Sequence, residues 1–138
     1  MDFFTDDVFL KRADEEGRRK MAESLRKKHP DLIENVIGRS ILSREINAFF
    51  VGEGRKYITV FATHHALESI TANVAYLLCD YLLTKSRYGR INGIDCKLML
   101  SKYRFIILPC VNPDGVELRY NPSDRSWRRY IFRHASSY

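Results

Sequence analysis

Tyr57-Ile-Thr-Val-Phe-Ala-Thr-His-His-Ala-Leu-Glu68 is the stretch of sequence that decides the fold. Its first half, up to Ala62, is β-branched and aromatic, which is typical of a buried strand. From Ala66 to about Ser86 the apolar residues recur at spacings of three and four, which predicts a helix with one apolar face. The segment therefore predicts a buried strand followed directly by a long amphipathic helix.

The segments on either side of this stretch complete the fold prediction. Tyr103 to Cys110 reads as a second buried strand, and a loop is predicted from Tyr88 to Asp95. A long helix between two continuous apolar strands is typical of a βαβ unit. A further strand is predicted from Arg44 to Val51, and a charged surface helix from Asp6 to His29. The sequence therefore predicts an α/β domain with a mixed, mainly parallel sheet and flanking helices.

Composition limits the class of protein. The 138 residues are 45% hydrophobic and 29% charged, which is typical of a folded domain and not of a disordered tail. The net charge is +6, but acidic residues are interspersed and no basic stripe alternates with aromatic residues, so we expect no nucleic-acid partner. Cys79, Cys96 and Cys110 lack CxxC spacing, which favours free thiols in a reducing compartment. No segment has the length of a membrane span and no secretory signal is seen, so a cytoplasmic location is the default expectation.

His65 and Glu68 are the strongest candidates for metal-binding residues. They follow the predicted strand, and their spacing places both side chains on one face of a helical turn. An imidazole and a carboxylate can together provide two ligands for Zn²⁺. Two other interpretations remain open: Glu68 can be a favourable residue at a helix N-terminus, and His64 can be the ligand or can pack against the sheet.

Two further motifs carry little information when each is taken alone. Asn112-Pro-Asp-Gly115 has the residues of a tight turn. Trp127 and Arg128 lie in Asp124-Arg-Ser-Trp-Arg-Arg129, where the arginine can either polarise a carbonyl near a metal or lie on the surface beside a packed tryptophan.

The order of these motifs resembles the zinc metallocarboxypeptidase family. The resemblance covers about 31–128 and rests on His-x-x-Glu after one strand, Pro109-Cys-Val-Asn-Pro-Asp-Gly115 after the next, and then Trp127-Arg128. The segment Ile37-Gly-Arg-Ser-Ile-Leu-Ser-Arg-Glu-Ile46 also looks like that family. The double histidine followed by Ala-x-Glu is similar to the bacterial branch that cuts γ-D-glutamyl–diamino acid bonds in cell-wall peptides.

The resemblance implies roles for individual residues. His65 and Glu68 would be two of the three ligands of one Zn²⁺, and Arg128 would polarise the scissile carbonyl and bind substrate. Asn112, Asp114 and Gly115 would form a structural turn beside the site. The substrate would be a peptide or a peptidoglycan-type peptide, hydrolysed by water that zinc activates.

The sequence departs from the family pattern after Arg128. An Asp-x-Asn-Arg motif is expected there, but 129–138 do not match it, and the third ligand histidine and the general-base glutamate are expected further downstream. The chain, 1–138, is therefore interpreted as one partial domain with low or no activity, and its open sheet edge favours self-association. The first alternative is a noncatalytic remnant that binds metal or peptide, and a basic nucleic-acid-binding domain ranks below it.

Overall fold

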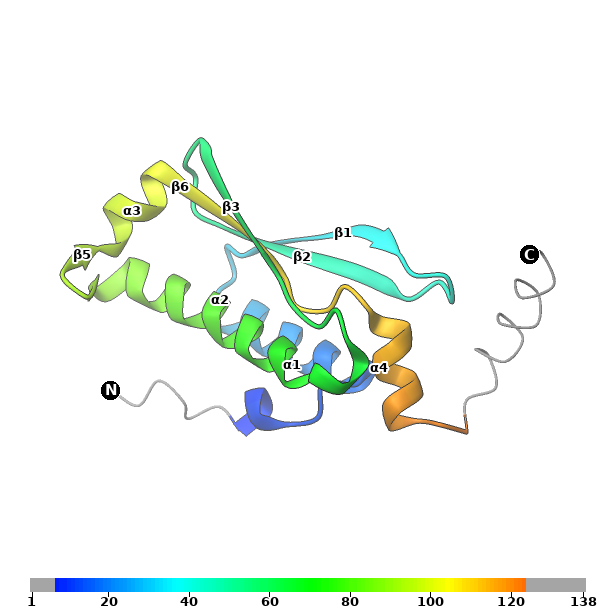
Figure 1. The fold of residues 1–138 in the computed structure, drawn as a ribbon. Coiled ribbons are helices and arrows are strands. Elements are labelled where there is room, and N and C mark those ends of the chain that lie inside the picture. The colour runs from blue at the N-terminus through cyan, green and yellow to red at the C-terminus, as the bar shows by residue number, and fades with distance from the viewer. Residues whose placement is uncertain (1–6, 124–138) are drawn as a thin grey trace.

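A computed structural model describes residues 7–123 of the chain. Figure 1 shows the order of the elements. They are the 3-10 helix η1 (Asp7–Leu10), α1 (Glu15–Lys28), β1 (Ile33–Arg39), β2 (Glu45–Val51), β3 (Lys56–Phe61), the 3-10 helix η2 (Ala66–Glu68), α2 (Ile70–Tyr88), β4 (Arg90–Ile91), β5 (Ile94–Asp95), α3 (Cys96–Lys102), β6 (Tyr103–Leu108) and α4 (Pro113–Tyr120).

A four-stranded sheet in the order β1-β2-β6-β3 forms the centre of the fold. The strands β3 and β6 pair in parallel, whereas β1–β2 and β2–β6 pair antiparallel. The predicted α/β class with a mixed sheet is confirmed. A mainly parallel sheet was expected, but among the described residues the antiparallel strand pairs outnumber the parallel pair. One reason is that a short turn joins β1 to β2, and a hairpin of this kind must be antiparallel.

The predicted βαβ unit consists of β3, α2 and β6. The crossover helix α2 begins at Ile70, and not at Ala66, because the separate short helix η2 comes first. The predicted loop around Tyr88–Asp95 contains the small hairpin β4–β5. The helix α3 follows and was not predicted; the side chain of Asp95 caps it by accepting a 2.9 Å hydrogen bond from Leu98 N.

The hydrophobic core lies between the sheet and the helices α1 and α2, which cover one face of the sheet (Figure 1). Phe49 of β2 and Ile107 of β6 are fully buried there, as are Met21 and Leu25 of α1. Each such side chain contributes about 1.5–3 kcal/mol through removal of its apolar surface from water. The core therefore fixes β6 and α1 against each other.

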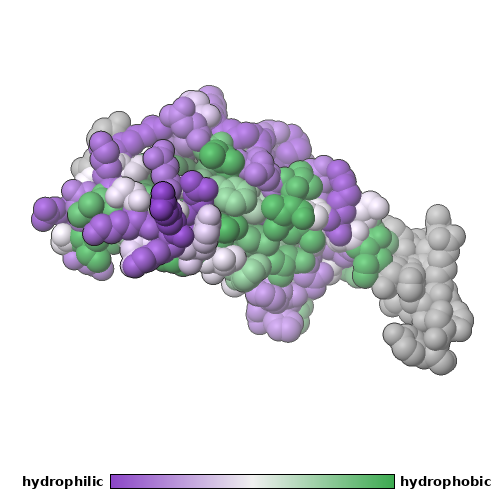
Figure 2. Space-filling model, turned by 90° about the horizontal axis from the view of Figure 1, so that it is seen from above, coloured by the Kyte–Doolittle hydropathy of each residue, from purple (hydrophilic) through white to green (hydrophobic). Residues whose placement is uncertain are grey.

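The opposite face of the sheet is not covered by any described helix. Phe50 lies on this face in register with Ile33 of β1 and Ile106 of β6, and Ile33 is 57% exposed. Seen from above, apolar side chains gather over this part of the molecule (Figure 2). Among the described residues, no further strand pairs with the outer edge of β3. An apolar face and an open edge therefore meet at β3.

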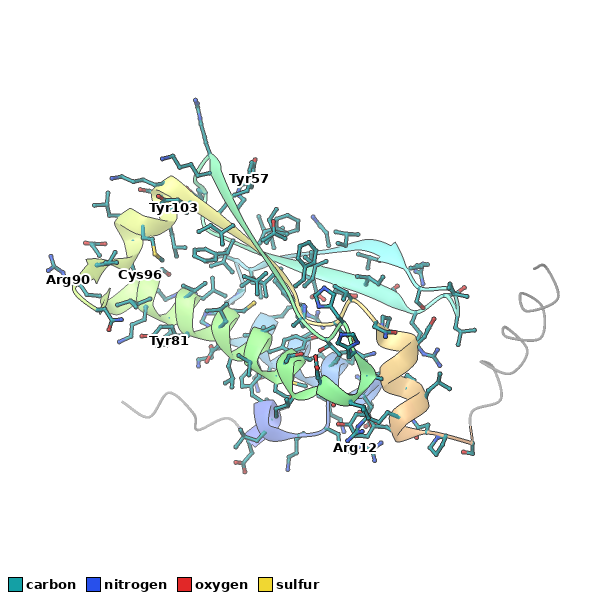
Figure 3. All side chains as sticks on the ribbon, in the orientation of Figure 1. Arg12, Tyr57, Tyr81, Arg90, Cys96 and Tyr103 are labelled. Atoms are coloured by element: carbon teal, nitrogen blue, oxygen red, sulfur yellow. The ribbon has the colours of Figure 1, made fainter. Side chains whose placement is uncertain are left out.

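A partly buried polar cluster joins the end of α1 to α2. His29 is 2% exposed, and its Nε2 lies 2.7 Å from Asp80 Oδ1, while Lys28 Nζ lies 2.8 Å from Asp80 Oδ2. At the other end of the core, the guanidinium of Arg12 stacks 4.3 Å above the ring of Tyr120 in α4 (Figure 3). These contacts hold the helices in place beneath the sheet.

None of the helices in 7–123 is long and apolar enough to cross a membrane.

Candidate metal site

The ends of β3 and β6 are held side by side beyond the last residues of both strands. Ala62 N donates to Leu108 O at 2.9 Å, Val111 N donates to Ala62 O at 3.1 Å, and Asn112 N donates to Thr63 O at 3.2 Å. Because the two strands are parallel, both of their carboxyl ends lie at this edge of the sheet. The motifs around His64 and Asn112 are therefore neighbours.

Thr63 turns the chain sharply before the two histidines. Its φ is 56°, a left-handed conformation that is a genuine outlier for a β-branched residue. Its amide donates to Thr71 Oγ1 at 2.8 Å, and its hydroxyl donates to Pro109 O at 3.0 Å. The Thr71 side chain of α2 and the Pro109 carbonyl after β6 thus hold Thr63 in its strained conformation. Backbone strain of this kind is concentrated at functional sites.

The side chains of His64, His65 and Glu68 are exposed at this edge. The ring of His64 lies 6.3 Å from that of Phe61, and Glu68 N donates a 3.0 Å hydrogen bond to His65 O. Within 7–123, none of these three side chains makes a hydrogen bond or an ion pair. The ring nitrogens of His65 and the carboxylate of Glu68 are therefore available to an incoming ligand.

The donors present suit part of a zinc site. His65 and Glu68 offer one imidazole and one carboxylate, which are two of the donor types that catalytic zinc takes, and they lie within one turn of chain. No group of three or more His, Cys, Asp and Glu that could hold a metal occurs among residues 7–123. The three cysteines are buried as free thiols, and burial raises the pKa of Cys79 and of Cys110.

Asn112 connects the two motifs. Its Oδ1 accepts a 2.9 Å hydrogen bond from Gly115 N, and its Nδ2 donates a 2.9 Å hydrogen bond to His64 O. The predicted isolated turn at 112–115 is therefore the first turn of α4, because Asn112 is an N-cap and Pro113 occupies a position where proline favours a helix start. A Cβ on Gly115 would lie 2.7 Å from Asn112 Nδ2, so a larger residue there would displace the Asn112 side chain and its two hydrogen bonds.

Asp114 has a role that the sequence did not predict. Its Oδ1 accepts hydrogen bonds from Ser40 Oγ at 2.7 Å and from Arg44 Nη1 at 2.8 Å, and its Oδ2 accepts from Leu42 N at 3.1 Å. One carboxylate thus fixes the turn between β1 and β2 to the start of α4. The only signal in the sequence was that Ser40 and Arg44 belong to the segment 37–46, which the family resemblance had already marked.

Trp127 and Arg128 lie outside the described residues. The structure thus brings together His64, His65 and Glu68 with Asn112, and it does not place the predicted arginine. The role assigned to Arg128 stays a prediction.

Comparison with known proteins agrees with this arrangement. The family model described as zinc carboxypeptidase matches residues 19–135. A γ-D-glutamyl-L-diamino acid endopeptidase of Lysinibacillus sphaericus is 34% identical over 100 residues, which cover 72% of this chain and 25% of that protein. The chain therefore spans about a quarter of the length of this relative.

Solved structures share the fold. Thrombin activatable fibrinolysis inhibitor superposes with a TM-score of 0.72 at 15% identity, over 88% of this chain and 30% of that one. A Shewanella denitrificans protein assigned as a carboxypeptidase A superposes with a TM-score of 0.54 at 25% identity, over 73% of this chain and 26% of that one. The family match extends on both sides beyond 31–128, where the sequence motifs lie. The chain therefore belongs to the zinc carboxypeptidase family.

Proposed function

We propose that this chain is the metal-binding part of a zinc peptidase that cuts γ-D-glutamyl–diamino acid bonds in cell-wall peptides. The observation that carries the proposal is the position of His65 and Glu68, exposed and without side-chain partners at the carboxyl ends of two parallel strands. The named activity of the Lysinibacillus relative supports this choice of substrate over a peptide with a free carboxyl terminus. The family resemblance of the His64-His65-Ala66 sequence supports the same choice.

The residues of the chain have separate tasks in this proposal. His65 and Glu68 bind the metal, and Asn112 fixes the backbone just before His65 through the carbonyl of His64. When zinc is bound it supplies a Lewis acid that lowers the pKa of water and polarises a carbonyl. Arg128 binds the substrate carbonyl and stabilises negative charge as it develops.

We further propose that the chain by itself hydrolyses substrate slowly. Two protein ligands hold zinc more weakly than the usual three, and the residues 7–123 offer no group of three donors. Efficient hydrolysis also needs a positioned general base. A noncatalytic protein that binds metal or peptide is the second candidate, and the same donor count favours it.

A hydrolysis assay separates these two candidates. The purified chain is incubated with zinc and either a γ-D-glutamyl–diamino acid peptide or an ordinary peptide with a free carboxyl terminus. We expect slow, zinc-dependent cleavage of the first peptide and none with the variant His65→Ala. Zinc or peptide binding without turnover would instead support the noncatalytic candidate, and turnover that is unaffected by His65→Ala would contradict both.

A further inference from the structure

A polar cavity of about 580 Å³ lies between α1 and the β1–β2 hairpin. The residues that matter for its chemistry are Arg18, Arg26, Arg44, Glu34, Tyr76 and Cys110. His65 and Glu68 do not line it, so the cavity is separate from the candidate metal site. Its volume lies within the range that small-molecule sites occupy.

Arg18 projects into this cavity with unused donors. It is 9% exposed, its Nη1 donates a 2.6 Å hydrogen bond to Ala13 O, and its Nη2 lies 3.9 Å from Glu117 Oε1, which is too far for a hydrogen bond. A guanidinium has five N–H donors, so most of them have no protein acceptor among the described residues. Arg18 is therefore a buried cation whose position is fixed and whose hydrogen bonding is incomplete.

Tyr76 is a second donor on the wall of the same cavity. It is 4% exposed, and its ring packs edge-on against Phe49 at 5.5 Å, which fixes its orientation. Its hydroxyl makes no hydrogen bond with any residue in 7–123, and it is not among the fully buried polar atoms that lack a partner, so it is accessible from the cavity. Burial raises the pKa of Tyr76, and the nearby charge of Arg18 lowers it less, so the hydroxyl stays protonated and can donate.

The acidic groups around the cavity are already engaged. Glu34 accepts hydrogen bonds from Arg26 and from Asn47 Nδ2, the latter at 2.6 Å. The other pairs are Glu45 with Arg39 at 2.8 Å, Glu15 with Arg44 at 3.3 Å, and Glu117 with Asn121 Nδ2 at 3.0 Å and with the amide of Glu15. Arg18 pairs only with Glu117, at 3.9 Å, which is longer than the other ion pairs around the cavity, so its positive charge is the least closely compensated there.

We propose that this cavity binds an oxyanion, the carboxylate or phosphate of a small molecule, through the guanidinium of Arg18 and the hydroxyl of Tyr76. A guanidinium matches both groups because it can donate two parallel hydrogen bonds to their oxygens. The hydroxyl adds a third donor from a rigid ring. The donors of Arg18 and Tyr76 that lack protein acceptors are not among the fully buried polar atoms, so a bound oxyanion can reach them.

The test is a calorimetric titration of the full chain with inorganic phosphate and, separately, with succinate. Ionic strength is held constant with sodium chloride, so that general screening by salt does not imitate binding. We expect saturable binding of at least one of the two anions, and the stronger one identifies the source of the oxyanion. Absence of saturable binding for both anions overturns the proposal.

Three variants locate the site. Arg18→Gln should weaken binding at least about tenfold, because it removes the charged donor. Since Arg18→Gln can also disturb folding through its bond to Ala13, Tyr76→Phe provides a milder variant that keeps the ring and should weaken binding severalfold. Lys20→Gln removes the same charge from the exposed face of α1, where Lys20 pairs with Glu16, and should leave the affinity unchanged. Equal binding by the parent, Tyr76→Phe and Lys20→Gln overturns the proposal.

Discussion

The side-chain amide of Asn112 donates a 2.9 Å hydrogen bond to the backbone carbonyl of His64, while its oxygen caps the first turn of α4. One residue therefore connects the end of β6 to the histidines that follow β3. The chain positions the candidate metal ligands through this contact and through the backbone bonds that continue beyond the two strands.

Two substitutions at Asn112 separate its two roles. Asn112→Ala removes the helix cap and should lower the free energy of unfolding by about 1 kcal/mol. Asn112→Asp keeps an acceptor for Gly115 N but loses the donor to His64, so stability should change less. Both variants should bind zinc roughly threefold to tenfold more weakly, because the backbone before His65 is less restrained. Urea unfolding and zinc titration check these expectations, and parent-like zinc affinity in Asn112→Asp would contradict the positioning role.

Asp114 is expected to be among the polar residues most important for stability. Asp114→Ala leaves the Ser40 hydroxyl, the Leu42 amide and the Arg44 guanidinium without their shared acceptor, and should lower the free energy of unfolding by about 2–4 kcal/mol. Asp95→Ala is the matched control, because it removes a single cap of α3 and should cost only about 1 kcal/mol. Urea denaturation measures both losses, and equal losses would show that the anchor at Asp114 is no stronger than a simple cap.

The stability of the protein should fall in acid because of Asp80. Burial raises the pKa of Asp80, but hydrogen bonds from His29 and Lys28 and the nearby positive charge lower it more, so that it lies below the ordinary 3.8. A carboxyl group whose pKa is lower in the folded state stabilises the fold above its unfolded pKa, and this contribution is lost as the pH falls through the folded pKa. We therefore expect the free energy of unfolding to decrease below about pH 4.

The variant Asp80→Asn tests this origin of the acid sensitivity. It should be less stable than the parent at pH 7, by about 1–3 kcal/mol, because Lys28 and His29 lose a charged acceptor. It should also show a shallower decrease in stability below about pH 4. The exposed Asp31→Asn variant provides the control and should follow the parent curve. If the parent and Asp80→Asn decrease in parallel, the acid sensitivity has another source.

We propose that the isolated chain self-associates through β3. The outer edge of this strand has no partner among the described residues, and Tyr57 (Figure 3) and Phe61 on it are 64% and 55% exposed. A lysine on such an edge disfavours pairing with another strand. We expect a mass that rises with concentration in sedimentation for the parent, and a monomer for Thr59→Lys. Leu98→Lys, on the exposed face of α3, is the control; monomeric parent protein would contradict the proposal.

The sequence predicted those strands and helices whose apolar residues repeat regularly along the chain. The strands β3 and β6 and the helix α2 were predicted because their apolar residues form continuous runs or a helical face. The strand β1 was not predicted, because its residues are largely exposed and its alternation between buried and exposed positions is weak. The helix α3 was missed because it has only seven residues and a mixed pattern.

Some residues of the candidate site could likewise be predicted from the sequence, and others could not. His65 and Glu68 were predicted as metal ligands because their spacing has a chemical meaning that is visible along the chain, whereas Asn112 was expected in a turn beside them only through the family resemblance. The clamp between Asp114 and Arg44 joins residues 70 positions apart, so local sequence carries no trace of it. The cavity at Arg18 depends in the same way on the packing of α1 against the hairpin, and an exposed arginine and a buried one look alike in a sequence.

Zinc titration calorimetry of the parent chain and three variants tests the central claim most directly. We predict that one zinc ion binds per chain, that His65→Ala and Glu68→Gln weaken the affinity by at least about tenfold, and that His64→Ala leaves it unchanged. The absence of saturable zinc binding by the parent would contradict the claim. Loss of binding in His64→Ala, with parent-like affinity in His65→Ala, would contradict it as well.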